Sequence, residues 1–333
     1  MDDKQIEKPL YIHVSKIASI LGYNKYVNTE KYVDMFIDYL YKDRYDLLKS
    51  DEEIKKDKIY NSNEKFNNLV SNLLSNISNE DKKTINNILK NSSKSTADIN
   101  RNNIKISKII KTIEDTKISK TIKNKIKNEL SSKINTKYGQ YNENVGIVKY
   151  QSITGNNVYN SNTQLYVIKQ NIEFETLNYC ICGKTDGFVD INDECHIFEI
   201  KNRKNKIFME IPIYETIQIL LYSYILNIQN VIFVQNFNDQ IKIDKIKINL
   251  YEDELNEELN EELNNSTTDS DNEDIQRNKI NYPSLFKEII NKLNRYIELI
   301  YKLRTNDELR LEFIGNTNNK KKLNIINNFI NNI

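Results

Sequence analysis

Two carboxylates and a lysine near the middle of the chain have the types and spacing needed for metal-assisted hydrolysis. They lie in the run GKTDGFVDINDECHIFEIK, residues 183–201, which predicts a strand, a tight turn at INDE and a returning strand, HIFEIK. Because side chains alternate between the two faces of a strand, Asp186 and Asp190 would share one face of the first strand. By the same rule, Glu199 and Lys201 would share one face of the second. We therefore expect Asp186, Glu199 and Lys201 to converge across a β-hairpin.

Such a cluster costs free energy unless a cation or a phosphate occupies it. Carboxylate oxygens bind Mg²⁺ or Mn²⁺ in preference to zinc, the metal ion polarises a phosphodiester and activates water, and a lysine steadies the nucleophile or the developing charge. The alternative is an exposed hairpin with incidental ion pairs, since 29% of the residues are charged. Apolar Phe198 and Ile200 flank Glu199, which favours the end of a buried strand. Charged side chains on a buried strand are costly, so their presence there calls for a functional explanation.

A polar pair interrupts the apolar helix predicted over 211–226, IPIYETIQILLYSYIL. Gln218 and Tyr222 are four residues apart, so they share one face of that helix. The alternative interpretation is a core helix that carries two incidental polar groups.

Asp186, Glu199-x-Lys201 and Gln218-x-x-x-Tyr222 together resemble the RecB-like branch of the PD-(D/E)XK nuclease superfamily. More closely, the chain resembles the lambda-exonuclease-like, YqaJ-type viral recombinase family. Two further segments carry this resemblance. In 137–155, the residues similar to the family pattern are Gly139, Glu143, Tyr150 and Gly155. In 13–32, they are Ser15, Ala18, Ile20, Leu21, Gly22 and Tyr26.

The resemblance implies an α/β fold with a restriction-endonuclease-like core, in which helices flank a central mixed β-sheet, plus a helical insertion. It implies a Mg²⁺-dependent (or Mn²⁺-dependent) DNA exonuclease that acts 5′ to 3′ on duplex ends in viral-type recombination, replication or repair. DNA is then the partner, a single-strand annealing protein is a candidate second partner, and a homo-oligomer is compatible with the family. Two alternatives stay open: a structure-selective endonuclease of the same fold, and a catalytically silent DNA-binding protein.

The resemblance also assigns roles at the metal site. Asp186 and Glu199 would bind the metal ion, with the backbone carbonyl of Ile200 as a third ligand. Asp190 stays open as an alternative to Asp186, because both lie on one face of the predicted strand. Lys201 would orient or deprotonate the attacking water.

Further roles follow from the same resemblance. Glu143, on a helix, would support the metal sphere directly or through water. Gln218 and Tyr222 would position the site or touch the DNA backbone. Ser15 would hold a DNA phosphate with help from Lys8, although Ser15 is also a plain candidate for a helix N-cap.

The resemblance covers about 8–45 and 137–235 and departs from the family at three points. Thr185 stands where the family has proline. Lys8 stands where relatives tend to have arginine, so one hydrogen bond from lysine to a DNA phosphate would replace the two-pronged contact of a guanidinium. The long segment 46–137 has no counterpart in the family.

Composition and pattern divide the chain into five parts. These are 1–45, the N-terminal helical part of the nuclease domain; 46–137, a lysine- and asparagine-rich helical insertion; 138–250, the nuclease core; 251–281, an acidic disordered insertion; and 282–333, a C-terminal helix and tail that pack on the core. Residues 101–137 hold 11 Lys/Arg against 3 acidic residues, which indicates either a solvated helical surface or an arm that contacts DNA phosphates. Pro283 should begin a buried helix, and the polar tail to 333 should fray.

The periodicity of apolar residues and the positions of turn residues also predict the helices and strands of the core. Over 10–45 we expect a short strand or loop followed by helices. The core elements expected are a helix at 139–153, strands at 163–174, 178–191 and 195–201, a helix at 212–227, and strands at 230–237 and 240–248.

Charge and cysteine content limit the classes of protein to which this chain can belong. Lys+Arg number 48 and Asp+Glu 47, so the whole chain lacks the basic balance of a general nucleic-acid binder. The three cysteines, Cys180, Cys182 and Cys195, favour small buried residues over a disulfide scaffold or a zinc site. No signal core or long apolar run is present, so we expect a soluble intracellular protein with no membrane partner, in the host cytoplasm or nucleus if viral.

Overall fold

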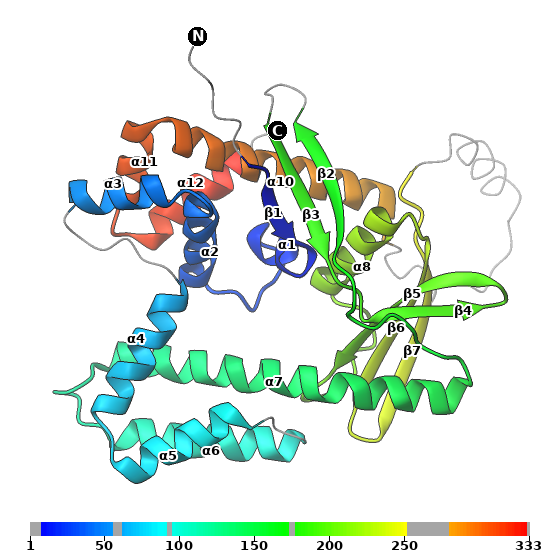
Figure 1. Ribbon diagram of the computed structural model, residues 1–333, viewed down its shortest axis with the longest axis horizontal. Helices are drawn as coiled ribbons and strands as arrows, with labels where there is room; N and C mark the ends of the chain where they lie inside the picture. The colour runs from blue at the N-terminus through cyan, green and yellow to red at the C-terminus, as the bar shows by residue number, and fades with distance from the viewer. Residues whose placement is uncertain (1–7, 56–61, 92–94, 173–176, 252–279, 332–333) are drawn as a thin grey trace, which may run out of the picture.

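The computed structural model describes residues 8–55, 62–91, 95–172, 177–251 and 280–331, where helices enclose two β-sheets (Figure 1). Both sheets are mixed, so the α/β class is as expected, but the strands form two sheets instead of one central sheet. None of the helices in these ranges is both long enough and apolar enough to span a bilayer.

The smaller sheet has the order β1-β3-β2. β1 (Leu10–His13) lies parallel to β3 (Leu177–Gly183), while β2 (Tyr166–Ile172) runs antiparallel to β3. The chain leaves β1 directly into α1 (Val14–Ile20) and then forms α2 (Thr29–Tyr41), which confirms the short strand followed by helices. These elements bring the N-terminus beside a strand that lies more than halfway along the chain.

The larger sheet has the order β4-β5-β6-β7. Its strands are β4 (Gly187–Ile191), β5 (Glu194–Asn202), β6 (Asn230–Phe237) and β7 (Gln240–Lys247). β5 and β6 are parallel, and the other neighbours are antiparallel. β5 is therefore an inner strand, hydrogen-bonded to a neighbour along both edges.

The hairpin β4–β5 forms as predicted, with Ile191 paired to Glu194 across a two-residue turn. Both turn residues, Asn192 and Asp193, have positive φ, at 53° and 63°. A tight hairpin turn of this kind requires positive φ at both central positions, and asparagine and aspartate tolerate it well.

Alternation along β5 sends its side chains to two different helices. Phe198 packs in an apolar cluster with α7 (Lys120–Thr154), whereas Ile197 belongs to the main core on the side of α8 (Ile213–Leu226). Glu199 is two residues after Ile197, so its side chain lies on the same face of β5 and is buried toward α8. A helix thus covers the charged face of β5, where Glu199 is buried and Lys201 is 23% exposed.

The single strand expected at 178–191 is wrong, because the chain breaks between β3 and β4 and enters the second sheet. The carbonyl oxygens of 184–186 accept hydrogen bonds from groups outside the strand ladders. The Tyr222 hydroxyl donates to the Lys184 carbonyl at 2.6 Å, and the backbone N–H of Asn162 donates to the Thr185 carbonyl at 3.2 Å. The Ser161 hydroxyl donates to the Asp186 carbonyl. These distant partners replace the ladder and end one sheet before the next begins.

α7 extends well beyond the helix expected at 139–153, and it changes its buried face along its length. In its first half, the residues buried against the helical insertion are Ile126, Leu130, Ile134 and Tyr138. In its second half, the residues packed on the larger sheet are Gly146, Ile147 and Tyr150. One rigid helix therefore connects the insertion to the sheet, and it ends at Gly155 with a φ of 74°.

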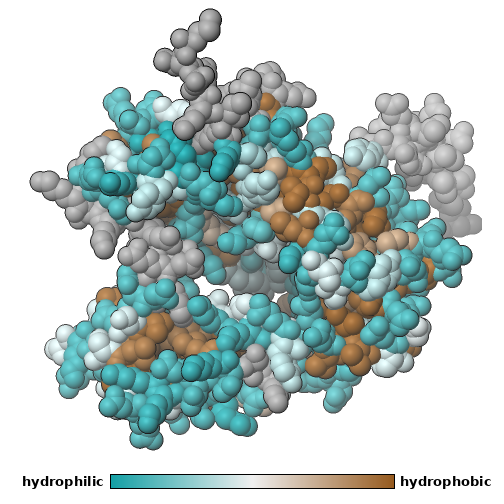
Figure 2. Space-filling view, in the orientation of Figure 1, coloured by the Kyte–Doolittle hydropathy of each residue, from teal (hydrophilic) through white to brown (hydrophobic). Residues whose placement is uncertain are grey.

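The described parts of the segment 46–137, which are 46–55, 62–91 and 95–137, are mostly helical, as predicted. Its helices are α3 (Tyr45–Lys55), α4 (Ser62–Ser75), α5 (Asn79–Lys90), α6 (Thr96–Thr112) and the first half of α7. α4 to α7 share a separate apolar cluster, so they form a helical body with its own small core. A hollow of about 780 Å³ lies between this body and the α1–α2 region, and Figure 2 shows the opening.

The expected frayed tail is wrong. After α10 (Tyr282–Thr305), which begins one residue before the predicted Pro283, the chain forms α11 (Asp307–Gly315) and α12 (Asn319–Asn331). Among the apolar residues of these two helices, Phe313, Ile326 and Ile330 are buried in the main core. The acidic run after residue 251 falls almost entirely outside the described residues.

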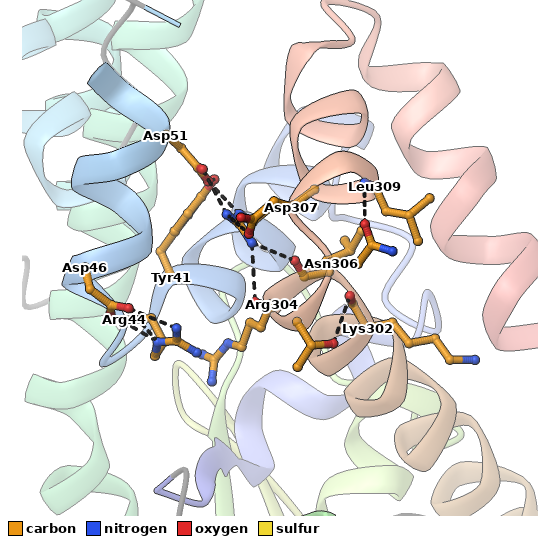
Figure 3. Close-up of polar contacts among 12 residues, drawn as sticks. Tyr41, Arg44, Asp46, Asp51, Lys302, Arg304, Asn306, Asp307 and Leu309 are labelled. Carbon is orange, nitrogen blue, oxygen red and sulfur yellow. Dashed lines mark hydrogen bonds and ion pairs between the residues drawn. The ribbon is translucent and has the colours of Figure 1, made fainter. Parts of the chain in front are cut away.

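A buried ion pair joins α3 to this C-terminal region. The Arg310 guanidinium donates to both oxygens of Asp51, at 2.7 and 3.1 Å, and both side chains are almost fully buried. Asp51 also accepts a hydrogen bond from Tyr41 at 2.7 Å. Figure 3 shows Asp51 and Tyr41 directed toward the α10–α11 junction, where Asp307 also contacts Arg310.

Asp51→Asn should lower the free energy of unfolding by about 3 to 5 kcal/mol, because it leaves the Arg310 charge buried without its partner. The matched control is Asp46→Asn on the same helix, whose ion pair with Arg44 is exposed to solvent and should contribute less than about 1 kcal/mol. Urea unfolding of both variants tests the comparison. Equal losses in the two variants would contradict it.

Candidate active site

The residues expected to do chemistry, Lys8 excepted, line one cavity of about 570 Å³. β5 forms its floor, α8 and α7 supply two walls, and the start of α1 reaches its rim. The predicted residues that line it are Ser15, Glu143, Asp186, Glu199, Ile200, Lys201, Gln218 and Tyr222. Segments up to about two hundred residues apart in the chain therefore meet at one place.

Glu199, Lys201 and Gln218 form a closed network inside the cavity. The Lys201 ammonium donates to Glu199 Oε1 at 2.5 Å and to Gln218 Oε1 at 2.9 Å. The Gln218 amide donates back to Glu199 Oε1 at 2.8 Å. Period-two geometry places the two charged residues on one face of β5, and α8 presents the glutamine to both.

We expected Asp186 to lie on the face of a strand. It instead reaches the cavity from the break between β3 and β4. Its Oδ2 accepts the backbone N–H of Ile200 at 2.9 Å, just beyond the point where β4 has begun to pair with β5. The N–H and C=O of one strand residue point to the same side, so the Ile200 carbonyl is directed toward Asp186 too. The carboxylate and this carbonyl are thus suitably placed to share a ligand.

Asp190, the alternative to Asp186, lies elsewhere. It is exposed near the far end of β4, does not line the cavity, and accepts a hydrogen bond from Tyr159 at 2.7 Å. The break before β4 removes Asp186 from the strand, so the expected shared face does not exist. Of the two aspartates, only Asp186 is available to this site.

Glu143 approaches from the second half of α7. Its carboxylate accepts a hydrogen bond from Asn162, whose backbone also donates to Thr185 beside Asp186. Gly146 permits this approach, since a Cβ there would lie 2.3 Å from the Ile200 side chain. The packing of α7 on β5 therefore brings a third carboxylate to the cavity.

Tyr222 and Gly183 form the wall nearest the smaller sheet. The Tyr222 hydroxyl donates to the Lys184 carbonyl, and a Cβ at Gly183 would lie 2.7 Å from the Tyr222 ring. Tyr222 therefore holds the β3–β4 break in place, because its ring fits against a residue without a side chain.

Of the two N-terminal candidates, Ser15 and Lys8, only Ser15 lies at the cavity. Ser15 lines the cavity but is not the N-cap of α1, since His13 occupies that position without a side-chain cap. Lys8 is exposed and is not among the lining residues. His13 does line the cavity, and burial together with the nearby Lys42 lowers its pKa, so it is neutral at pH 7.

Sequence reasoning missed three residues at the site, namely Asn162, Arg203 and Glu215. Arg203 and Glu215 are both buried, line the cavity, and form a two-pronged ion pair at 2.6 Å for each contact. Arg203 continues the alternation of Glu199 and Lys201, and Glu215 is three residues before Gln218, so both periodicities could have revealed this pair. No local signal marks Asn162, which lies in the α7–β2 connection.

Three carboxyl groups of the cavity, those of Glu143, Asp186 and Glu199, have raised pKa values. Burial, together with the charge of Asp186, raises the pKa of Glu199 to about 8 and that of Glu143 to about 7. Burial raises the pKa of Asp186 as well. Burial alone would lower the pKa of Lys201, but Glu199 and Asp186 outweigh it, and the pKa rises to about 12.

The donor set suits a hard divalent cation. The second oxygen of Glu199, Oε2, is buried and has no hydrogen-bond partner, which is unusual for a carboxylate oxygen and is the situation that a cation relieves. Asp186 and Ile200 line the same cavity. Within the described ranges, no group of three or more His, Cys, Asp or Glu side chains has the geometry of a metal cluster, so backbone and water oxygens would have to complete the sphere.

The cysteines form no disulfide. All three are free; Cys180 and Cys182 are buried in β3, as predicted, whereas Cys195 is exposed, which corrects the expectation that it is buried.

Comparison with known proteins adds little. No protein-family model matches the chain, and no curated protein is significantly similar to it. Among solved structures, the crystal structure of SSO0001 matches part of the chain at 16% identity with a TM-score of 0.28. The match covers 37% of this chain and 58% of SSO0001, so it carries no conclusion about function.

Proposed function

We propose that the chain is a Mg²⁺-dependent deoxyribonuclease with a restriction-endonuclease-like core, related to the YqaJ-type exonucleases that its motifs resemble. The observation that carries the proposal is the buried Glu199–Lys201–Gln218 network beside Asp186, with one carboxylate oxygen left unpartnered. A buried, partly satisfied polar cluster of this kind destabilises a fold, and a catalytic role accounts for its presence.

Each residue then has a task that its position permits. Asp186, Glu199 and the Ile200 carbonyl hold Mg²⁺ or Mn²⁺, which supplies Lewis-acid polarisation of the scissile phosphate and lowers the pKa of water. Lys201 orients the attacking water and balances charge as the phosphate oxygen becomes more negative.

The other cavity residues support these. Glu143 extends the carboxylate set from α7, and Gln218 keeps Lys201 directed at Glu199. Tyr222 maintains the β3–β4 break that presents Asp186. Ser15, on the rim, is available to a DNA phosphate, whereas Lys8 has no such support from its position.

Exonuclease action, 5′ to 3′ from duplex ends, is proposed from the resemblance alone, as are a single-strand annealing protein as partner and a homo-oligomer. The deciding experiment compares linear and circular duplex DNA with Mg²⁺ and with EDTA. Degradation of linear DNA only supports the exonuclease, and nicking of circles supports the structure-selective endonuclease. Binding without metal-dependent cleavage on either substrate would leave a silent DNA-binding protein and refute the nuclease.

Metal affinity should rise with pH, because Glu199 and Glu143 hold protons in the metal-free protein at neutral pH. A cation binds the ionised form and displaces those protons, so the apparent affinity should increase about tenfold per pH unit for each proton displaced, up to the pKa of Glu199 at about 8. Calorimetric titration with Mn²⁺ in buffers of different ionisation enthalpy measures both the affinity and the protons released. An affinity that does not change between about pH 6 and pH 8 would contradict this expectation.

A further inference from the structure

A second, larger hollow lies next to the cavity. It is a groove of about 1340 Å³ between β7, which is the edge strand of the larger sheet, and the starts of α8 and α10. The loop 208–214 and the turn after α1 form its other sides. Neither the metal site nor the network around Lys201 uses this groove.

Aromatic and apolar side chains are exposed along the groove. Tyr26 is 67% exposed and Met209 82%, both large side chains that gain nothing from this exposure in an isolated chain. Tyr26 meets the Tyr214 ring edge-on, with the centroids 5.9 Å apart. Single exposed apolar residues are ordinary, but several around one groove are typical of an interaction surface.

Lysines lie among these side chains. Lys25, Lys245 and Lys247 are exposed and line the groove, and the structure shows no ion pair for them within the described ranges. Lys242 also lines it but is paired with Asp244 at 2.9 Å. The groove therefore offers positive charge next to flat aromatic faces, the combination that binds a single nucleic-acid strand through its phosphates and its bases.

Only a thin wall separates the groove from the catalytic cavity. The first turn of α8 lies between the two, since Glu215 lines the cavity while Tyr214 and Thr216 line the groove. Arg203 forms the rest of the wall: it pairs with Glu215 and stacks on Phe208, a groove residue, at 4.5 Å. A strand that separates at the cavity would reach the groove without crossing the body of the protein.

We propose that this groove binds single-stranded DNA, and specifically the strand left behind when its complement is hydrolysed in the cavity. The assignment to the spared strand rests on the proposed nuclease function. An acidic peptide would satisfy the lysines equally well, but it would make no use of Tyr26, whose exposed ring can stack on a base of any sequence. Holding the spared strand would keep the duplex end open at the cavity.

The test measures fluorescence anisotropy of labelled oligo(dT) of about 20 nucleotides in EDTA, so that no cleavage occurs. Tyr26→Ala should weaken binding about tenfold, and Tyr26→Phe, which keeps the ring, should restore it. The matched control is Tyr45→Ala, which removes a tyrosine that is 77% exposed on the distant helix α3 and should leave binding unchanged.

The lysines are tested by salt dependence. Replacing Lys245 and Lys247 together by alanine should lower the slope of log affinity against log salt by about 1.4, because each phosphate of a single strand that is no longer neutralised accounts for about 0.7. The control is the pair Lys320→Ala and Lys321→Ala, exposed lysines of α12 that do not line the groove, and it should leave the slope unchanged.

Each outcome decides the proposal. Equal oligo(dT) binding by wild type, Tyr26→Ala and the lysine pair overturns the groove assignment even if Mg²⁺-dependent cleavage is observed. Loss of binding in these variants, with no cleavage under any metal, refutes the nuclease and leaves the groove as a site for single-stranded DNA. Binding that appears only after deletion of 252–274, whose flanking residues Asn249 and Ile280 line the groove, would assign it to the acidic run and overturn the proposal.

Discussion

Replacing Lys201 by alanine is expected to reduce DNA cleavage by about 10³-fold or more, while DNA binding changes little. The ammonium contacts both Glu199 and Gln218 within the cavity, so its loss removes the positive charge nearest the proposed metal ligands. It does not remove any surface that a long duplex would contact. The rate loss should therefore appear in single-turnover cleavage with saturating enzyme, where binding no longer limits the observed rate.

Two controls separate catalysis from folding and from general charge. Glu199 already has a raised pKa, so it can take up a proton when its partner is removed, and thermal unfolding should show a folded variant. Lys184→Ala removes another cation from the cavity lining that has no contact with Glu199, and it should change the single-turnover rate by less than about tenfold. Full cleavage by folded Lys201→Ala would refute the site.

Asp186→Asn is expected to abolish metal-dependent cleavage and to weaken Mn²⁺ binding by at least about 100-fold. The amide oxygen of asparagine can still accept the Ile200 N–H, so the local backbone should be preserved while the ligand charge is removed. Calorimetric Mn²⁺ titration and cleavage of linear duplex measure the two effects on the same preparation.

Asp190→Asn is the matched control, because it makes the same chemical change within β4. Asp190 is exposed and bonded to Tyr159, outside the cavity, so this variant should bind Mn²⁺ and cleave DNA like the wild type. The opposite pattern, with loss at Asp190 and none at Asp186, would transfer the metal site to the other aspartate.

Several features of the site could be predicted because they depend on local periodicity. Alternation along β5 was sufficient to place Glu199 and Lys201 on one face, and they contact each other. Helical spacing placed Gln218 and Tyr222 on one side of α8, and both line the cavity. The INDE turn follows from residues that tolerate positive φ. Each of these relations joins residues that are close neighbours along the chain.

Other features depend on contacts between distant segments, which local pattern does not contain. The buried apolar residues of α11 and α12 are covered by α2 and α10, and spacing along the chain does not show which segments would cover them. α7 is only weakly amphipathic along its whole length, because its two halves are buried on different faces by different parts of the chain.

By itself, the sequence determined the hairpin, the helix and the set of side chains able to bind a metal ion, since backbone geometry relates neighbours along the chain in a set way. Only the tertiary structure decided that Asp186, and not Asp190, joins Glu199 and Lys201. Tyr222, Ser161 and Asn162 hydrogen-bond the carbonyls of 184–186 and break the strand there. These partners lie tens of residues away, so it is their packing that directs the aspartate into the cavity.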